Sequence, residues 1–281
     1  MARNKIAIVT GANKGLGFEL VKALCAKYDG KVYLTSRNEK RGREAVEKLK
    51  EMDCYPEYHQ LDITDAKCIK QMVTHINNND LKVDILINNA GVFFLKDAKE
   101  PMSVQSEQCV GVNFFSVVNF TEAILPYLTE GGKIVNISSS SGHLSRIPSQ
   151  ELRQKFLSDN LKLEELKELM KRYLDDVEKN TYKQDWGESA YVVSKVALNA
   201  YTFMLHRKLF CEKGVIVNCV HPGYLKTDMT HGGGTMHACE GTRAPLLALE
   251  ETQGGLFLWH DGTRVPWDGP DPRGFIDGRK V

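Results

Sequence analysis

Two side chains that could exchange a proton lie one helical turn apart in residues 189–195. Tyr191 and Lys195 are four residues apart, a spacing that places both on one face of a helix. A phenol has a pKa of about 10, too high for efficient proton exchange near neutral pH. A neighbouring ammonium, and a positively charged cofactor if one binds there, would stabilise the phenolate and lower that pKa. The pair predicts that Tyr191 acts as a general acid, although a Tyr and a Lys at this spacing are most often only surface neighbours.

A glycine-rich turn follows the first apolar stretch of the chain and opens a helical pattern. Glycines let the backbone turn tightly and approach a pyrophosphate, which then sits at the positive N-terminus of the helix. The spacing Gly-x-x-x-Gly-x-Gly differs from the standard dinucleotide fingerprint, and Gly15 and Gly17 are useful for helix–strand packing even without a nucleotide. The strand–turn–helix context still favours a dinucleotide site. The residues expected to contact the cofactor here are Gly11, Asn13, Lys14, Gly15, Leu16 and Gly17.

The residue type about 20 positions beyond this turn distinguishes the two nicotinamide cofactors. Counting 37 − 17 = 20 from Gly17 leads to Arg37, immediately after the second expected strand. A carboxylate there would hold the ribose 2′-hydroxyl of NAD and repel the 2′-phosphate of NADP, whereas a guanidinium can grip that phosphate with two hydrogen bonds. Lys14 supplies a second cation. Either could be a solvated surface charge, but the two positions together predict NADPH.

Composition excludes several classes of protein. The chain has 281 residues, 42% of them hydrophobic, so it can bury a sizeable core. Its net charge of +1, without a basic stripe, gives no support to a nucleic-acid partner. No run of 18 apolar residues predicts a membrane span, and the N-terminal residues do not resemble a secretion leader. Seven scattered cysteines without a Cys-x-x-Cys pair argue against disulfides and a metal site, so we expect a cytoplasmic protein.

Short β-branched stretches alternate with longer stretches of helical period, a pattern typical of an α/β fold with a parallel sheet. The expected strands cover residues 5–10, 31–36, 58–61, 83–87, 133–137 and 215–220, with a weaker one at 255–259. The expected helices lie near residues 16–28, 40–52, 65–78, 104–128 and 188–211. Because the alternation is unbroken, we expect one domain over residues 1–281.

Two stretches depart from the alternation. Residues 148–187 form a charged, helix-prone insert in which apolar residues from Leu163 to Val177 recur at spacings of three and four, as in an amphipathic helix. From about residue 231 the chain becomes a tail that we expect to be rich in loops, with six Gly and three Pro beyond residue 253.

Several motifs in order resemble the short-chain dehydrogenases/reductases over roughly residues 5–230. The motifs are the glycine-rich turn, Asn88-Asn-Ala-Gly91, a serine at the end of the fifth strand, Tyr191-x-x-x-Lys195, Asn113 in the preceding helix and Pro222-Gly223 after the sixth strand. The resemblance implies a Rossmann-type, doubly wound parallel sheet. It also implies a catalytic group made of Asn113, Ser139, Tyr191 and Lys195.

The same resemblance assigns roles to individual positions. Ser139 would orient the substrate carbonyl, although neighbouring serines leave its register open, and Asn113 would help to hold a water beside Lys195, unless it only satisfies backbone groups. Tyr191 and Lys195 would also contact the cofactor. The other expected cofactor contacts are Asp62 and Ile63 beside the adenine, Asn89, Ala90 and Gly91 above the ribose, and Leu225 and Thr227 at the carboxamide.

The long insert distinguishes one branch of the family. Ser139 and Tyr191 are 52 residues apart, farther than in most relatives, and this insert together with Asn13, Lys14 and Arg37 resembles the carbonyl reductase branch. The expected substrate contacts are Phe94, Gln105, Ser139, Trp186 and Tyr224. Tyr224 stands where close relatives often carry Trp, and the tail matches poorly, so the substrate stays open.

These features predict NADPH-dependent reduction of aldehydes, ketones or quinones to alcohols. The alternatives are a non-catalytic NADPH-binding redox sensor and an alcohol or steroid dehydrogenase of the same family. Family members commonly dimerise through the helices near 104–128 and 188–211. The apolar stripe of the insert also needs an apolar surface to pack against. We expect it to pack against the faces of these two helices, which blocks the dimer contact and leaves a monomer.

Overall fold

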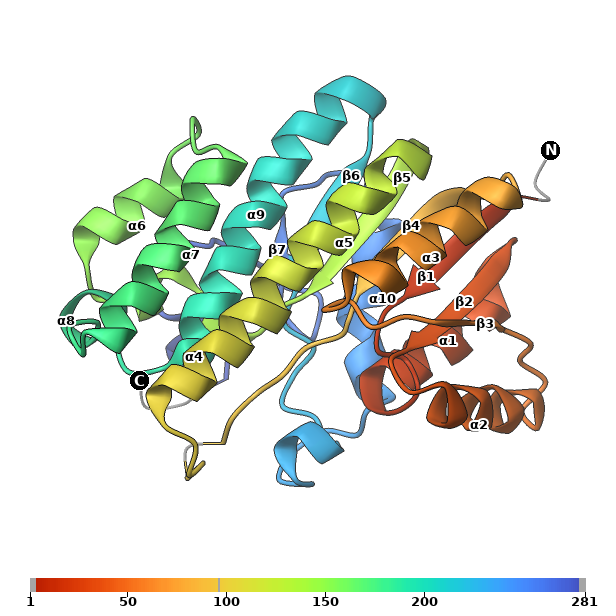
Figure 1. The fold of residues 1–281 in the computed structure, drawn as a ribbon, viewed down its shortest axis with the longest axis horizontal. Coiled ribbons are helices and arrows are strands. Elements are labelled where there is room, and N and C mark those ends of the chain that lie inside the picture. Colours follow the sequence, from red (N-terminus) through yellow and green to blue (C-terminus); the bar gives the residue numbers. More distant parts are fainter. Residues whose placement is uncertain (1–3, 96, 278–281) are drawn as a thin grey trace.

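The computed structural model describes residues 4–95 and 97–277, whose strands form one twisted sheet (Figure 1). Along the sheet the strands run in the order β3-β2-β1-β4-β5-β6-β7-β8. All neighbours are parallel except β7 and β8, which pair antiparallel. The strands are β1 (Lys5–Val9), β2 (Lys31–Ser36), β3 (Glu57–Gln60), β4 (Lys82–Asn88), β5 (Leu128–Ile137), β6 (Ile216–Val220), β7 (Phe257–Leu258) and β8 (Arg264–Val265).

Helices cover both faces of the sheet. One core contains side chains of α1, α2 and α10, and the other contains side chains of α3, α4, α5, α6, α7 and α9. The helices are α1 (Gly15–Lys27), α2 (Glu39–Lys50), α3 (Ala66–Asn78), α4 (Met102–Val110), α5 (Val117–Ile124), α6 (Gln150–Leu157), α7 (Leu163–Glu178), α8 (Lys183–Trp186), α9 (Ala190–Lys213), α10 (Arg243–Glu250) and α11 (Pro272–Phe275). This three-layer arrangement confirms the predicted α/β Rossmann-type doubly wound fold.

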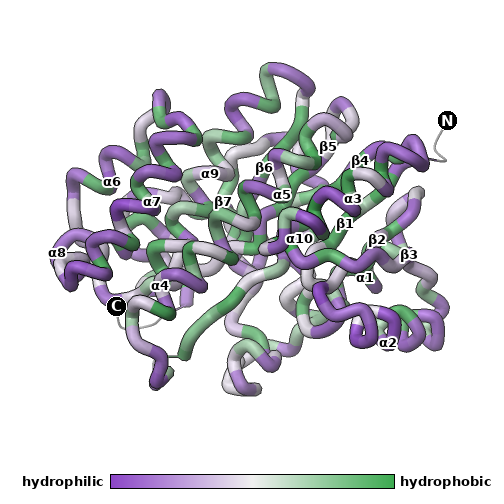
Figure 2. Tube along the Cα trace, in the orientation of Figure 1, coloured by the Kyte–Doolittle hydropathy of each residue, from purple (hydrophilic) through white to green (hydrophobic). Residues whose placement is uncertain are grey.

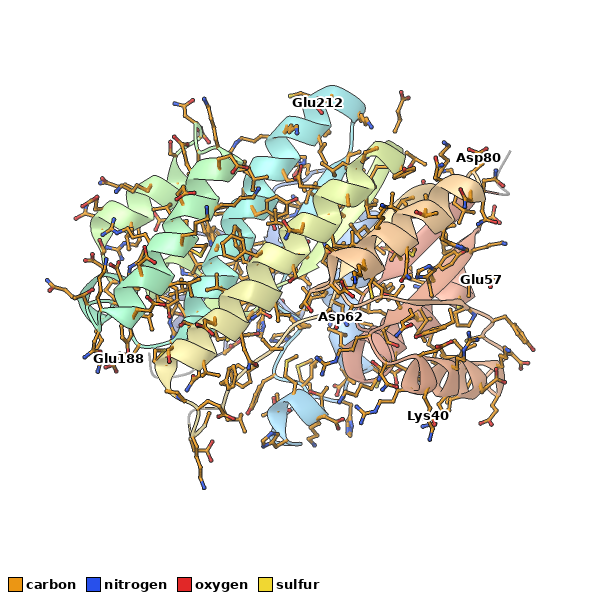
Figure 3. All side chains as sticks on the ribbon, viewed as in Figure 1. Lys40, Glu57, Asp62, Asp80, Glu188 and Glu212 are labelled. Atoms are coloured by element: carbon orange, nitrogen blue, oxygen red, sulfur yellow. The ribbon has the colours of Figure 1, made fainter. Side chains whose placement is uncertain are left out.

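The burial of the strands follows from the two helical layers. β1 is buried from Ile6 to Val9 and β6 along its whole length, because helices lie over both faces. In Figure 2 the central strands are coloured hydrophobic, whereas α2 at the outside is mostly hydrophilic. Charged side chains such as Lys40 and Glu212 accordingly project outward in Figure 3.

The insert forms α6, α7 and α8, and its apolar stripe faces the body of the protein. Leu166, Met170, Tyr173 and Val177 of α7 are buried. The α7 helix packs against α4 and α9 (Figure 1). These two helices belong to the stretches near 104–128 and 188–211, through which family members commonly dimerise. Since α9 is covered by the sheet on one side and by α4 and α7 on others, its residues from Ala190 to Thr202 are almost all buried and it shows little amphipathic pattern.

One helical stretch, Met102–Tyr127, is long and apolar enough by length and composition to cross a membrane. This stretch differs from the expectation, because the sequence contains no uninterrupted run of 18 apolar residues. Many of its apolar residues, among them Val110, Phe114, Val118 and Phe120, are fully buried in the core, and α3 and α9 lie beside it in the same layer (Figure 1). A core helix passes the same test of length and composition, and this burial explains the apolar character.

Two parts of the C-terminal region escaped the sequence analysis. The α10 helix and the β8 strand are short, and the hairpin of β7 and β8 has only two residues in each strand. Periodicity cannot be detected in such short elements. The expected helix near 104–128 is also interrupted, because residues Gly111–Ser116 form a π-helical turn between α4 and α5.

Candidate active site

The floor of the site joins the loops after β1 and β4, between which the strand order reverses direction. The hydroxyl of Thr10 accepts hydrogen bonds from the amides of Asn89 and Ala90, each at 3.0 Å. The Asn89 side chain donates to the carbonyl oxygens of Thr10 (2.8 Å) and Gly11 (3.1 Å). Asn88 instead points into the core, where it donates to Thr121 and Asn136. Ligands of doubly wound sheets bind at this reversal of strand order, and here its two loops form one connected surface.

The glycine-rich turn leaves a helix N-terminus free for an anion. Gly11 has a φ of +62°, and a Cβ on Gly17 would lie 2.5 Å from Asn89 Nδ2 and 2.8 Å from the carbonyl oxygen of Gly11. Both positions therefore require glycine. The α1 helix has no side-chain cap at Lys14 and no acidic residue in its first turn. Its first amides and its dipole thus fit a phosphate group, as the binding of a dinucleotide requires.

Two predicted cations lie near this turn. Arg37 is exposed directly after β2 and has no ion-pair partner within residues 4–95 and 97–277. Lys14 is bound to Asp228, with 2.6 Å between Nζ and Oδ2. The described residues thus fit the 2′-phosphate of NADPH, with Arg37 available and Lys14 able to exchange Asp228 for the phosphate.

Tyr191 and Lys195 project from the first turns of α9, whose start is capped by the Ser189 side chain. Lys195 is only 5% exposed, and its Nζ donates to the carbonyl oxygen of Ile137 at 2.8 Å and lies 5.7 Å from the centre of the Tyr191 ring. Phe93 packs edge-on against Tyr191, with 4.7 Å between ring centroids. Tyr191 and Lys195 thus lie together on one face of α9. Ile137 at the end of β5 binds Lys195, and Phe93 in the loop after β4 packs against Tyr191.

Burial shifts both pKa values away from their ordinary range. It raises the pKa of Tyr191 to about 12, opposed by a hydrogen bond with Ser139, and lowers the pKa of Lys195 to about 8. Burial thus raises the phenol pKa in the protein without cofactor. The lowered pKa expected from the sequence concerns the protein with an oxidised nicotinamide bound, and it stays a prediction. The phenol is therefore protonated near neutral pH and able to donate a proton.

The structure resolves the register of the serines. Ser139 lies at the end of β5 with its hydroxyl against Tyr191, and it also accepts a hydrogen bond from the Ser141 amide at 3.1 Å. Ser138 is buried, and its hydroxyl has no hydrogen-bond partner among the described residues. Of these serines, Ser139 is the one placed beside the phenol.

Asn113 holds the loop after β4 in place. It is fully buried on the π-helical turn, where its carboxamide accepts from the Val92 amide (2.8 Å) and donates to the Val92 carbonyl (2.9 Å). Its Nδ2 also lies 3.1 Å from Ser194 Oγ, which donates to the carbonyl oxygen of Tyr191. The hydrogen-bonding groups of the Asn113 side chain are thus occupied mainly by backbone groups. Asn113 links the start of α9 to the cofactor cradle, by which we mean the glycine-rich turn after β1 and the loop after β4.

Comparison with known proteins agrees with this geometry. Residues 5–150 match the family model described as short chain dehydrogenase. The chain belongs to the short-chain dehydrogenase family.

Relatives in this family cover nearly the whole chain. The protein is 36% identical over 253 residues to carbonyl reductase (NADPH) 3 of Mus musculus, covering 88% of this chain and 91% of the relative. It is 35% identical over 286 residues to carbonyl reductase (NADPH) 1 of Bos taurus, covering 99% and 98%. Among solved structures, salutaridine reductase from Papaver somniferum matches with a TM-score of 0.80 and 33% identity, covering 90% of this chain and 99% of that one.

The structure separates the substrate residues predicted for this short-chain dehydrogenase. Phe94 and Tyr224 are partly exposed, and the Gln105 side chain donates to the carbonyl oxygen of Glu100 at 2.8 Å. Trp186 does not belong with them. It is completely buried within the insert, between Phe156 and Tyr173, and its indole donates to Asp176 at 2.9 Å. The assignment of Trp186 to the substrate mouth is therefore wrong, because the insert needs the ring for its own core.

The remaining predicted cofactor residues lie around the cradle or beneath it. Asp62, on the segment after β3 (Figure 3), accepts hydrogen bonds from the amide and hydroxyl of Thr64 through one carboxylate oxygen. The side chains of Ile63 and Leu225 are buried in the two cores, so a cofactor could contact these residues only through their backbone groups. Thr227 reaches the glycine-rich turn, since its methyl group would be 3.4 Å from a Cβ on Gly15.

Two charged residues near the cradle escaped the sequence analysis. Asp228 pairs with Lys14 across 214 residues of sequence, and both Lys14 and the Arg41 guanidinium contribute to lowering the Asp228 pKa. Arg41 lies four residues after Arg37, at the start of α2. That spacing was a signal for Arg41, whereas nothing in the sequence indicated Asp228.

Proposed function

We propose that this short-chain dehydrogenase reduces aldehydes, ketones or quinones to alcohols with NADPH, and that Tyr191 donates the proton. The observation that carries the proposal is the position of Tyr191 beside Ser139 and Lys195, close to a glycine-rich turn with exposed cations. The similarity to carbonyl reductases supports NADPH as the cofactor and a carbonyl compound as the substrate.

When bound, NADPH supplies the hydride that reduces the carbonyl carbon. The Ser139 hydroxyl donates to the carbonyl oxygen and stabilises the negative charge that develops there. The Tyr191 hydroxyl then transfers its proton to that oxygen. Lys195 holds positive charge next to the resulting phenolate, and Asn113 fixes the surrounding loop. The proposed cofactor contacts would bring the nicotinamide to this group of residues.

The free protein keeps Tyr191 in the form that reduction uses. Burial raises the pKa of Tyr191 to about 12, so its hydroxyl carries a proton at pH 7, whereas oxidation of an alcohol needs the phenolate as a base. The positive charge of Lys195 beside the phenolate assists the transfer of that proton. Alcohol or steroid oxidation is the weaker alternative because Arg37 and Lys14 favour NADP, which cells keep mostly reduced. A redox sensor without catalysis would have no need for a buried Lys195 next to Tyr191 and Ser139.

The protein is further proposed to be a cytoplasmic monomer without nucleic-acid or membrane partners. Its net charge of +1 and its scattered free cysteines support this proposal. The position of α7 over α4 and α9 supports the monomer, because a partner chain would need those helix faces.

The test measures NADPH consumption by the purified protein against a panel of quinones, aldehydes and steroids. Tyr191→Phe keeps the ring but removes the proton donor, so turnover should fall by at least a hundredfold, the lower range for general acid catalysis. NADPH affinity, measured by fluorescence titration, should change by less than about twofold because no phosphate contact is lost. Turnover of the variant within tenfold of the wild type would contradict the role of Tyr191.

A further inference from the structure

The segment that follows Ser139 has little regular structure of its own. Residues Ser140–Gly142 and Leu144–Arg146 form two single 3₁₀ turns before the insert begins. Single turns contribute few internal hydrogen bonds, so such a segment keeps its conformation only through contacts with other parts of the chain. Ser139 must nevertheless face Tyr191 accurately, because a displacement of about 1 Å can cost a hundredfold in rate.

The C-terminal tail supplies these contacts. The Trp267 indole donates to the carbonyl oxygen of Gly142 at 2.7 Å, and the Leu144 amide donates to the carbonyl oxygen of Trp267 at 3.1 Å. The buried ring of His143 donates through Nε2 to the carbonyl oxygen of Pro266 at 3.0 Å. Arg146 lies 4.0 Å from Asp271. The segment 142–146 is thus held along its length by residues 266–271.

The other side of the segment is held by α9. Asn199 donates to the same carbonyl oxygen of Gly142 at 3.0 Å, so this oxygen accepts one hydrogen bond from α9 and one from the tail. A Cβ on Gly142 would lie 2.7 Å from Asn199 Nδ2 and 3.1 Å from the carbonyl oxygen of Lys195, so the approach is too close for any other residue.

The tail is anchored on the helix that carries the catalytic side chains. The Trp267 ring packs against Phe203 of α9, with 5.0 Å between ring centroids. Phe203 lies eight residues, about two helical turns, after Lys195. Trp267 therefore connects α9, which carries Tyr191, to the segment that carries Ser139.

We propose that Trp267 is a positioning residue, which clamps the segment after β5 so that the Ser139 hydroxyl faces Tyr191. This inference rests on the proposed function, because it concerns the same catalytic group. It gives the tail a role in the reaction that its loop-rich sequence does not indicate.

The first test needs no activity. Trp267→Phe keeps an aromatic ring against Phe203, removes the indole donor and loses part of the ring volume, so the protein should fold. Hydrogen exchange of the amides in residues 141–146 should become roughly tenfold faster, because one of two bonds to Gly142 is lost. Trp259→Phe is the matched control, since it removes the indole bond of Trp259 to Asp277 (2.8 Å) in the same tail. Unchanged exchange in Trp267→Phe, or equal acceleration in both variants, would overturn the clamp.

The second test is a double-mutant cycle with Ser139→Ala. If Trp267 acts through Ser139, Trp267→Phe should lower kcat roughly tenfold in the wild-type background and less than about twofold in the Ser139→Ala background. The affinity for NADPH should be retained in both backgrounds. Equal losses of kcat in the two backgrounds would show a general structural role and overturn the proposal.

These outcomes are separable from failure of the proposed function. If wild-type protein consumes no NADPH with any carbonyl compound, the function fails while the exchange experiment still decides the clamp. If Trp267→Phe is too unstable to study, Arg146→Gln removes the ion pair at the other end of the clamp and should show the same pattern with a smaller change.

Discussion

Replacing Arg37 by Asp should change the cofactor preference more than any change at Lys14. Arg37 is exposed and forms no ion pair with any residue that the structure describes, so its full interaction is available to a 2′-phosphate, whereas Lys14 must first leave Asp228. A bidentate guanidinium–phosphate contact contributes about 1.5–3 kcal/mol, and solvent exposure argues for the lower end of that range.

This free energy translates into a measurable ratio. A loss of about 1.4 kcal/mol is a factor of ten, and repulsion between Asp and the phosphate adds a comparable factor. In Arg37→Asp, the ratio of kcat/KM with NADPH to kcat/KM with NADH should therefore fall roughly a hundredfold. Lys14→Ala should lower the ratio only about threefold, because in the wild type Lys14 must give up its ion pair with Asp228 before it binds the phosphate. In an Asp228→Asn background, where that ion pair is absent, Lys14→Ala should lower the ratio by more.

Steady-state kinetics with both cofactors and one carbonyl substrate provide the assay. Arg43→Ala is the matched control, because Arg43 lies on α2 and pairs with Glu39 at 2.8 Å. The ratio should be unchanged in this control. An unchanged ratio in Arg37→Asp would refute the assignment of the phosphate site, and a change confined to Lys14→Ala would move that site away from β2.

Three further predictions concern stability and assembly. Lys195→Met should abolish turnover yet raise the free energy of unfolding at pH 7 by about 1–3 kcal/mol, since the buried ammonium has a pKa of about 8 against 10.5 for the ordinary side chain. That gain in unfolding free energy, measured by urea unfolding, should shrink as the pH rises from 8 to 10.5. In this range the folded wild type loses the proton of Lys195, whereas the unfolded chain still binds it. A gain independent of pH would contradict the lowered pKa of Lys195. Trp186→Phe should lower the unfolding free energy by about 1–2 kcal/mol through loss of its bond to Asp176, with KM for carbonyl substrates unchanged; a large rise in KM would return Trp186 to the substrate site. Light scattering at micromolar concentration should give a mass near 31.6 kDa, and twice that mass would contradict the covering role of α7.

Local patterns in the sequence were sufficient to predict the fold and to name most residues of the proposed site. The strands that are buried on both faces appear in the sequence as continuous apolar runs. The turn after β1 carries glycines at positions where a Cβ would collide with neighbouring atoms. The spacing of Tyr191 and Lys195 fixes their common helix face. These features depend on residues near one another in the chain, so periodicity and spacing reveal them.

Features that depend on distant residues were decided only by the tertiary structure. The sequence determined that a phenol, an ammonium and a serine are present, that they lie at strand and helix ends, and that cations follow the first two strands. The structure decided that Ser139 and not Ser138 meets Tyr191, that desolvation raises the phenol pKa, that Trp186 belongs to the core of the insert, and that Asp228 holds Lys14. The physical reason is that burial, desolvation and long-range pairing are properties of the packed chain, which joins segments that the sequence keeps far apart.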